Sequence, residues 1–112
     1  MRLAADERKY TLAKQNNELV PLYTEPKIQD FIYWCVVANR FPHSRIADVD
    51  DLLVLKREAN IGDISRAEWQ ELFMIYPSLD GDYDLITHNF ASMRSVITIP
   101  HFHLYKLKKG YK

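Results

Sequence analysis

Short apolar segments, each bounded by polar residues or turn formers, recur along this chain. Residues 31–38 are aromatic and β-branched, which predicts a buried central strand, and residues 52–55 predict a second strand. The short connection between them favours an antiparallel pair. Residues 83–87 and roughly 97–107 follow the same apolar pattern and predict two further strands.

One segment between these strands has helical spacing instead. Ser65 is followed three residues later by Glu68, a capping-box pattern in which the two side chains satisfy backbone amides at the helix start. Beyond it, Pro77 is expected to end the helix. The expected apolar stripe, spaced i, i+3, i+4 and i+7, consists of Trp69, Leu72, Phe73 and Tyr76.

The N-terminal part of the chain is different in character. Residues 4–17 are charged and free of glycine, which predicts a surface helix, and Pro21 and Pro26 mark an extended segment after it. With 112 residues and no linker that would divide the chain, a single domain over residues 1–112 is expected. The predicted fold is α+β: an antiparallel sheet with a main helix packed on one face, and an N-terminal helix.

The composition and net charge of the chain limit the kinds of molecule that it is expected to bind. Fifteen basic and fifteen acidic side chains cancel, so no net field recruits nucleic acid or an anionic membrane, although a small phosphorylated ligand needs only local donors. The longest apolar run is too short to cross a bilayer, and the N-terminus lacks the apolar stretch of a signal peptide. Cys35 is the sole cysteine and is expected to be a buried thiol in a reducing compartment. The cytoplasm is the expected location.

The last predicted strand carries the candidate chemistry. Because strand side chains alternate, His101, His103 and Tyr105 should share one face, while Phe102 and Leu104 point into the core. Two imidazoles about 7 Å apart on one face can hold a phosphate between them, or one of them can attack it.

Two other interpretations of this strand stay open. The pair can form a solvated polar face, since this spacing of histidines is common. A metal site would need further ligands, such as His43 or His88, because two imidazoles are too few. No metal or other cofactor is predicted.

The order of motifs along residues 31–108 resembles the histidine-triad (HIT) superfamily of nucleotide hydrolases and transferases. That family has a strand ending in Asn-Arg-x-Pro, a strand of the type His-Leu-Leu-Val-x-Pro-Lys-Arg, a helix, and a final strand in which three histidines alternate with apolar residues. Here the matching segments are residues 34–42, residues 51–57, the helix start at 63–68, Asn89, and residues 98–104.

The resemblance implies roles for individual residues. The middle histidine of the family motif is the nucleophile that carries the nucleotidyl group, and His103 occupies that position, while His101 helps to orient it. Asn39 matches the strand-end residue that binds ribose hydroxyls, although such an asparagine more often simply ends a strand. Asn89 lies near a phosphate-binding asparagine of the family. Thr98 matches a hydroxyl that donates to the phosphate or leaving group, although a β-branched residue also suits a strand.

The chain also departs from the family pattern. Tyr105 replaces the third histidine, as a further candidate contact to the phosphate, and Leu55 replaces the proline of the second strand. Residues 96–97 lack the glycine that lets backbone approach phosphate, and Asp50 and Asp51 stand where the family has histidine or glycine.

The expected function is therefore binding of a nucleotide or dinucleotide, with cleavage of a phosphoanhydride, phosphoramidate or phosphodiester bond through His103. The alternative is a catalytically degenerate module that binds a nucleotide or a protein. The resemblance also implies a homodimer.

Overall fold

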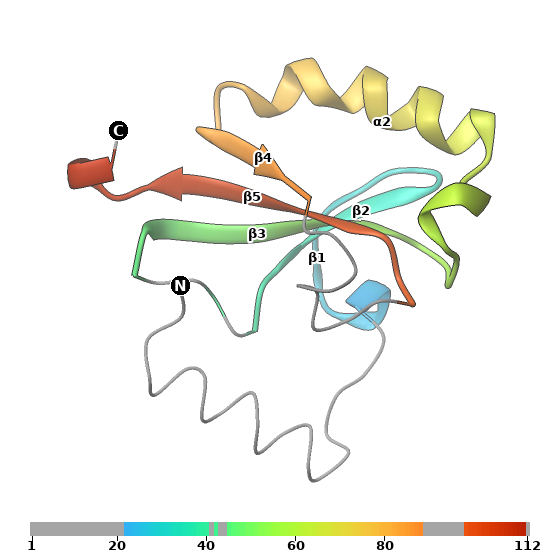
Figure 1. Cartoon of the computed structure of the whole chain (residues 1–112), viewed down its shortest axis with the longest axis horizontal. Helices are drawn as coiled ribbons and strands as arrows, with labels where there is room; N and C mark the ends of the chain where they lie inside the picture. The colour runs from blue at the N-terminus through green and yellow to red at the C-terminus, as the bar shows by residue number, and fades with distance from the viewer. Residues whose placement is uncertain (1–21, 41, 43–44, 89–97, 112) are drawn as a thin grey trace, which may run out of the picture.

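The computed structural model describes residues 22–40, 42, 45–88 and 98–111. Within these residues the protein is an α+β structure of one antiparallel sheet and one α-helix, as predicted (Figure 1). The elements are β1 (Lys27–Asp30), β2 (Trp34–Ala38), β3 (Ala47–Leu55), α2 (Arg66–Leu79), β4 (Leu85–Thr87) and β5 (His101–Leu107), with short 3₁₀ turns at Leu22–Thr24, Ile61–Asp63 and Lys109–Tyr111. The N-terminal helix predicted over residues 4–17 lies outside the described residues.

The sheet has the strand order β1-β2-β3-β5-β4, and every neighbouring pair is antiparallel. The predicted pairing of β2 with β3 is confirmed, with Trp34 opposite Leu55 and Val36 opposite Leu53. Strand β3 is longer than its apolar pattern predicts, because it begins at Ala47 and carries acidic residues within the ladder. Strand β4 is shorter than predicted and begins only at Leu85.

Helix α2 begins as the capping box predicts. The Ser65 hydroxyl accepts from the backbone amide of Glu68 at 3.2 Å, and the Glu68 carboxylate accepts from the amide of Ser65 at 2.9 Å. The prediction that Pro77 ends the helix is wrong, since α2 continues to Leu79 with Pro77 inside it. Pro77 and Phe73, whose carbonyl would otherwise accept from position 77, are both exposed, so water can replace the missing hydrogen bond.

The predicted apolar stripe of the helix is only partly right. Leu72 is buried, but Phe73 and Tyr76 are 67% and 53% exposed. The face that packs on the sheet instead contains Leu72, Ile75 and Leu79, which have the equally helical spacing i, i+3 and i+7. The two stripes overlap at Leu72, and compact aliphatic side chains occupy the space above the sheet.

The sheet buries apolar side chains on both faces, in two separate clusters. Helix α2 covers one face, where residues including Trp34, Leu53 and Leu104 form the larger cluster (Figure 1). The opposite cluster consists of Cys35, Val37, Leu52, Val54 and Ile99. Cys35 is fully buried, as predicted, and the placement of Leu104 in the core is confirmed.

Two carboxylates of α2 tie the helix to the strands. Glu68 accepts two hydrogen bonds from the Arg57 guanidinium, both at 2.8 Å, and Glu71 accepts from the amides of Tyr33 and Trp34 at the start of β2. The Arg57 guanidinium, helped by the Ser65 amide, lowers the pKa of Glu68 to about 2. Within the described part of the chain, no helix is long and apolar enough to span a membrane.

Candidate functional site

The face of β5 that points away from α2 carries the predicted row of side chains. The ring centroids of His101 and His103 are 5.6 Å apart, and the ring of Tyr105 stacks on that of His103 at 5.5 Å with an interplanar angle of 10°. All three are buried, with exposed fractions of 7%, 5% and 2%. The alternative of a solvated polar face is therefore wrong, and the His103 imidazole is part of the interior.

His103 is paired with a carboxylate from the neighbouring strand. Its Nδ1 lies 3.2 Å from Oδ1 of Asp50, whose side chain is 1% exposed. The ladder between β3 and β5 explains the contact: Asp50 is opposite Tyr105 and Leu52 is opposite His103, so Asp50 and His103 are diagonal neighbours on one face. An ionised carboxylate only accepts, so Nδ1 of His103 carries a proton, and the lone pair of the neutral ring is on Nε2.

Asn39 joins the same group of side chains. Its amide Nδ2 donates to the other oxygen of Asp50 at 2.9 Å, and its backbone amide donates to the Asp50 carbonyl at 3.1 Å. A buried carboxylate is tolerated only where donors replace its water, and Asn39 and His103 supply one donor to each oxygen. The structure thus brings Asn39 and His103 together through Asp50.

The other histidine of the row has a different partner. Nδ1 of His101 lies 2.9 Å from the carbonyl oxygen of Ile99, which can only accept, so this ring also carries its proton on Nδ1. Pro100, between them, immediately precedes β5, a position that suits a residue that cannot donate to the ladder. The positions of both imidazoles are therefore set by hydrogen bonds at Nδ1.

Of the remaining predicted site residues, Thr98 is not part of this group. Thr98 is exposed, and its carbonyl accepts from the Ala59 amide at 2.9 Å, which places it at the surface. Asn89 lies outside the described residues, as do residues 96–97. Among the residues that are described, no group of three or more histidine, cysteine, aspartate or glutamate side chains is arranged to hold a metal ion.

Asp50 is the member of the site that the motif comparison noted only as a departure. A signal for it was present in the alternation of Asp50, Leu52 and Val54, which places the carboxylate on the face opposite Leu53. Asp51 accordingly points to the helix side, where it accepts from the Tyr83 hydroxyl at 2.5 Å. Burial raises the pKa of Asp51, and burial together with the Asp51 carboxylate raises the pKa of Tyr83.

Comparisons with protein-family models, curated proteins and solved structures find no match for this chain. What the site can do chemically follows from its own groups. An imidazole whose Nδ1 is hydrogen-bonded to a carboxylate is held in one orientation, which suits Nε2 to act as a nucleophile or as a general base. The group around His103, named here the Asp50–His103 cluster, consists of Asn39, Asp50, His101, His103 and Tyr105.

Proposed function

We propose that this protein is a HIT-like nucleotide-binding protein that cleaves a phosphoanhydride, phosphoramidate or phosphodiester bond through a nucleotidyl intermediate on His103. The observation that carries the proposal is the pairing of His103 Nδ1 with the buried Asp50 carboxylate. That pairing leaves the nucleophilic lone pair of the neutral ring on Nε2 and fixes the direction in which it points. The order of motifs along residues 31–108 supplies the reaction class.

The proposed reaction has two balanced steps. First, Nε2 of His103 attacks the α-phosphorus, an N–P bond forms, and the bond from phosphorus to the leaving group breaks with its electron pair going to that group. Next, water or another acceptor attacks the same phosphorus and the N–P bond breaks, which returns the neutral imidazole and releases the nucleotide. Asp50 is a positioning residue in both steps, because it stabilises the imidazolium character that the ring gains when Nε2 is phosphorylated.

The Asp50–His103 cluster also supplies the proposed contacts to the substrate. Asn39 is proposed to lie near the ribose, and its hydrogen bond to Asp50 couples that contact to the nucleophile. Tyr105 can offer one hydroxyl donor to phosphate but no cation, so the site has less positive charge than a three-histidine site. Slow turnover is therefore expected. Asn89 and Thr98 remain proposed contacts to the phosphate or leaving group on the family resemblance alone.

A second function is favoured by the burial of the site. With His103 and Tyr105 at 5% and 2% exposed, the row can act as a rigid polar part of the core in a protein that binds a nucleotide or a protein partner without turnover. The two functions differ in one respect: only the enzyme transfers a nucleotidyl group. Homodimerisation and a cytoplasmic location belong to either proposal, and sedimentation velocity tests the dimer.

The proposal is tested by single-turnover hydrolysis of a nucleoside 5′-phosphoramidate and of a dinucleotide polyphosphate. His103→Asn is the informative variant, because the asparagine amide can still donate to Asp50 while the nucleophilic Nε2 is lost. His88→Asn is the matched control, since His88 packs against Phe102 on the opposite side of the sheet. We expect loss of about three or more orders of magnitude in His103→Asn and little change in His88→Asn. Nucleotide binding by the wild type without any turnover supports the second function instead.

A further inference from the structure

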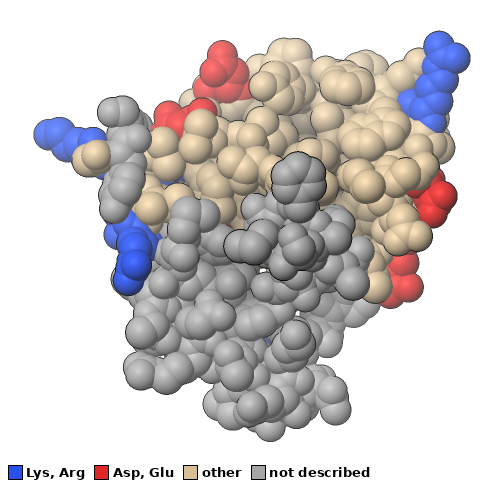
Figure 2. Space-filling view, viewed as in Figure 1, with Lys and Arg blue, Asp and Glu red and all other residues tan. Residues whose placement is uncertain are grey.

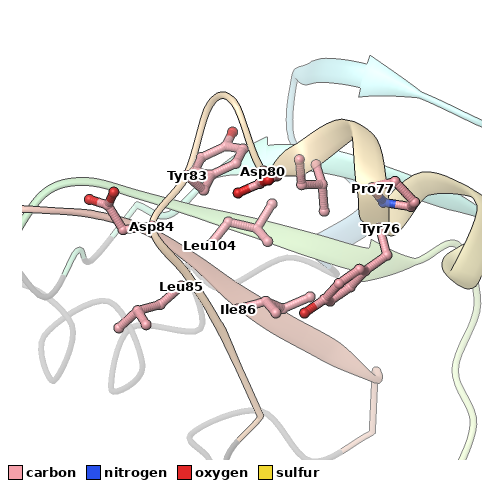
Figure 3. Close-up of a pocket in the computed structure, with 9 residues that line it drawn as sticks. Tyr76, Pro77, Asp80, Tyr83, Asp84, Leu85, Ile86 and Leu104 are labelled. Atoms are coloured by element: carbon pink, nitrogen blue, oxygen red, sulfur yellow. The ribbon is translucent and has the colours of Figure 1, made fainter.

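A hollow of about 450 Å³ lies at the C-terminal end of helix α2 (Figure 3). Its volume is within the range of about 300–1,000 Å³ that is typical of small-molecule sites. Four parts of the chain enclose it: the last turn of α2, the segment that leads into β4, β4 itself, and β5. The lining residues are Tyr76, Pro77, Leu79, Asp80, Tyr83, Asp84, Leu85, Ile86 and Leu104.

The hollow and the Asp50–His103 cluster are on opposite faces of the sheet. Leu104 belongs to the helix-side core and lines the hollow, whereas its neighbours His103 and Tyr105 point to the other face. A ligand in the hollow therefore cannot touch the His103 imidazole. The hollow is a separate candidate site rather than an extension of the proposed nucleotide site.

The walls combine apolar and aromatic surfaces. Leu104 is fully buried beneath the hollow, and Leu85 at its margin is 45% exposed. Tyr76 on α2 and Tyr83 in the segment before β4 contribute aromatic rings (Figure 3). The Tyr83 hydroxyl donates to the Asp51 carboxylate at 2.5 Å, which fixes that ring in place. Apolar walls and a preformed aromatic face suit a ligand with a hydrocarbon body.

The charge at the mouth of the hollow is negative. Asp80 and Asp84 line it, and acidic side chains gather over the turn between α2 and β4 at the edge of a broad uncharged surface (Figure 2). The negative pole of the helix dipole ends here too, with no basic residue in the last turn of α2. The Asp84 carboxylate also accepts a hydrogen bond from the backbone amide of Leu107 at 2.8 Å, and Lys106, two residues beyond Leu104, is exposed.

From these observations we infer that the hollow binds a small organic cation: a primary ammonium or guanidinium group on an apolar body. The charged group lies at the acidic mouth near Asp80 and Asp84, and the body packs on Ile86 and Leu104, which face each other across the ladder on the helix side of the sheet. The tyrosine rings add an attraction for the cation that a neutral ligand of the same shape does not feel. This site is independent of the proposed nucleotidyl chemistry.

The test uses 2-phenylethylammonium as the probe, with 2-phenylethanol as its neutral isostere, in ¹H–¹⁵N NMR titrations of the full chain. The expected result is saturable shifts at Tyr83, Ile86 and Leu104 with the ammonium, and affinity for the alcohol lower by at least about threefold. Equal affinity for both probes, or no shift at these amides up to the solubility limit of the ammonium, overturns the inference.

Asp80→Asn and Asp82→Asn form a matched pair of variants. Both residues are exposed acids of the same turn, but Asp80 lines the hollow and Asp82 does not. Asp80→Asn should weaken ammonium binding about two- to fivefold without affecting the alcohol, and Asp82→Asn should have a smaller effect. An equal loss of ammonium affinity in both variants would show only a diffuse negative field, and it would contradict a specific contact between the ammonium group and Asp80. Turnover by wild type and Asp80→Asn is compared in parallel, and equal rates are expected, so failure at one site is distinguishable from failure at the other.

Discussion

Across the ladder of β5 and β3, Nδ1 of His103 lies 3.2 Å from Oδ1 of Asp50, and both side chains are almost completely buried. This contact gives the imidazole a defined proton position at Nδ1. It also gives the carboxylate a donor that it would otherwise lack in the interior. Removing either partner therefore affects both the chemistry of the ring and the stability of the sheet.

Asp50→Asn tests the positioning role of the carboxylate. The amide keeps the size of the side chain but removes the charge that accepts the Nδ1 proton's hydrogen bond. We expect the rate of nucleotidyl transfer to fall by about 10²-fold or more, while nucleotide affinity changes little. Long-range ¹H–¹⁵N correlations of the His103 ring should show the Nδ1–H form in the wild type and a changed tautomer population in the variant. An unchanged ring signature together with an unchanged rate would contradict the role.

His103→Ala is expected to destabilise the protein by about 1–3 kcal/mol, because it leaves the buried Asp50 carboxylate without one of its donors. His103→Asn should cost less, since its amide can replace the Nδ1 donor. Met74→Ala is the control, because Met74 is 80% exposed and its truncation should change the free energy of unfolding by less than about 0.5 kcal/mol. Urea unfolding monitored by tryptophan fluorescence measures all of these. Equal stability of the alanine variant and the wild type would show that the pair contributes nothing to the fold.

Tyr105 is where the chain leaves the three-histidine pattern, and its ring stacks on His103. Tyr105→His should raise the rate of hydrolysis, because an imidazolium can stabilise transition-state charge that a neutral phenol cannot. Tyr105→Phe keeps the stacking but loses the hydroxyl, so phosphate affinity should fall. Single-turnover rates and nucleotide affinities of the three proteins on one substrate provide the comparison. If the phenylalanine variant matches wild type in both, the hydroxyl has no contact with the phosphate.

The stability of the fold should depend on acid pH through Glu68. The Arg57 guanidinium lowers the pKa of this carboxyl from its ordinary value of 4.5 to about 2 in the folded protein. The corresponding stabilisation is present above the unfolded pKa, and it is lost as the pH falls from about 4.5 towards 2. Glu68→Gln should be less stable than wild type by about 1–3 kcal/mol at pH 7, with the difference shrinking through this window. Parallel pH curves for the two proteins would contradict this origin.

Much of the sheet and the start of the helix could be predicted from the sequence, because the residue patterns that indicate them are local. The β-branched run of β2, the capping box at Ser65 and the alternation along β5 each require knowledge only of neighbouring residues. The buried face of helix α2 was harder to predict, because two overlapping apolar stripes share Leu72. Which stripe packs on the sheet depends on the shape of the space between helix and sheet, and there Ile75, and not Phe73, faces inward. The prediction that Pro77 ends the helix failed for a similar reason. The free-energy cost of a proline inside a helix depends on whether water can replace the lost hydrogen bond.

The candidate site was predicted only as far as one strand could show it. Alternation places His101, His103 and Tyr105 on one face of β5. Their burial, however, depends on the apolar cluster on the face of the sheet away from α2, and most of that cluster comes from other strands. Asp50 was missed because its role depends on the register between β3 and β5, which is a long-range property. Its position on the His103 face follows once that register is known.

Trapping the intermediate shows whether His103 carries the nucleotidyl group. Wild-type protein and His103→Asn are mixed with a nucleoside 5′-phosphoramidate, quenched within one turnover at alkaline pH, and measured by intact-mass spectrometry followed by peptide mapping. We expect the wild type to gain the mass of one nucleotidyl group on the peptide that contains His103, and the variant to gain none. Turnover without any adduct, or an adduct on another residue that persists in His103→Asn, would contradict this expectation.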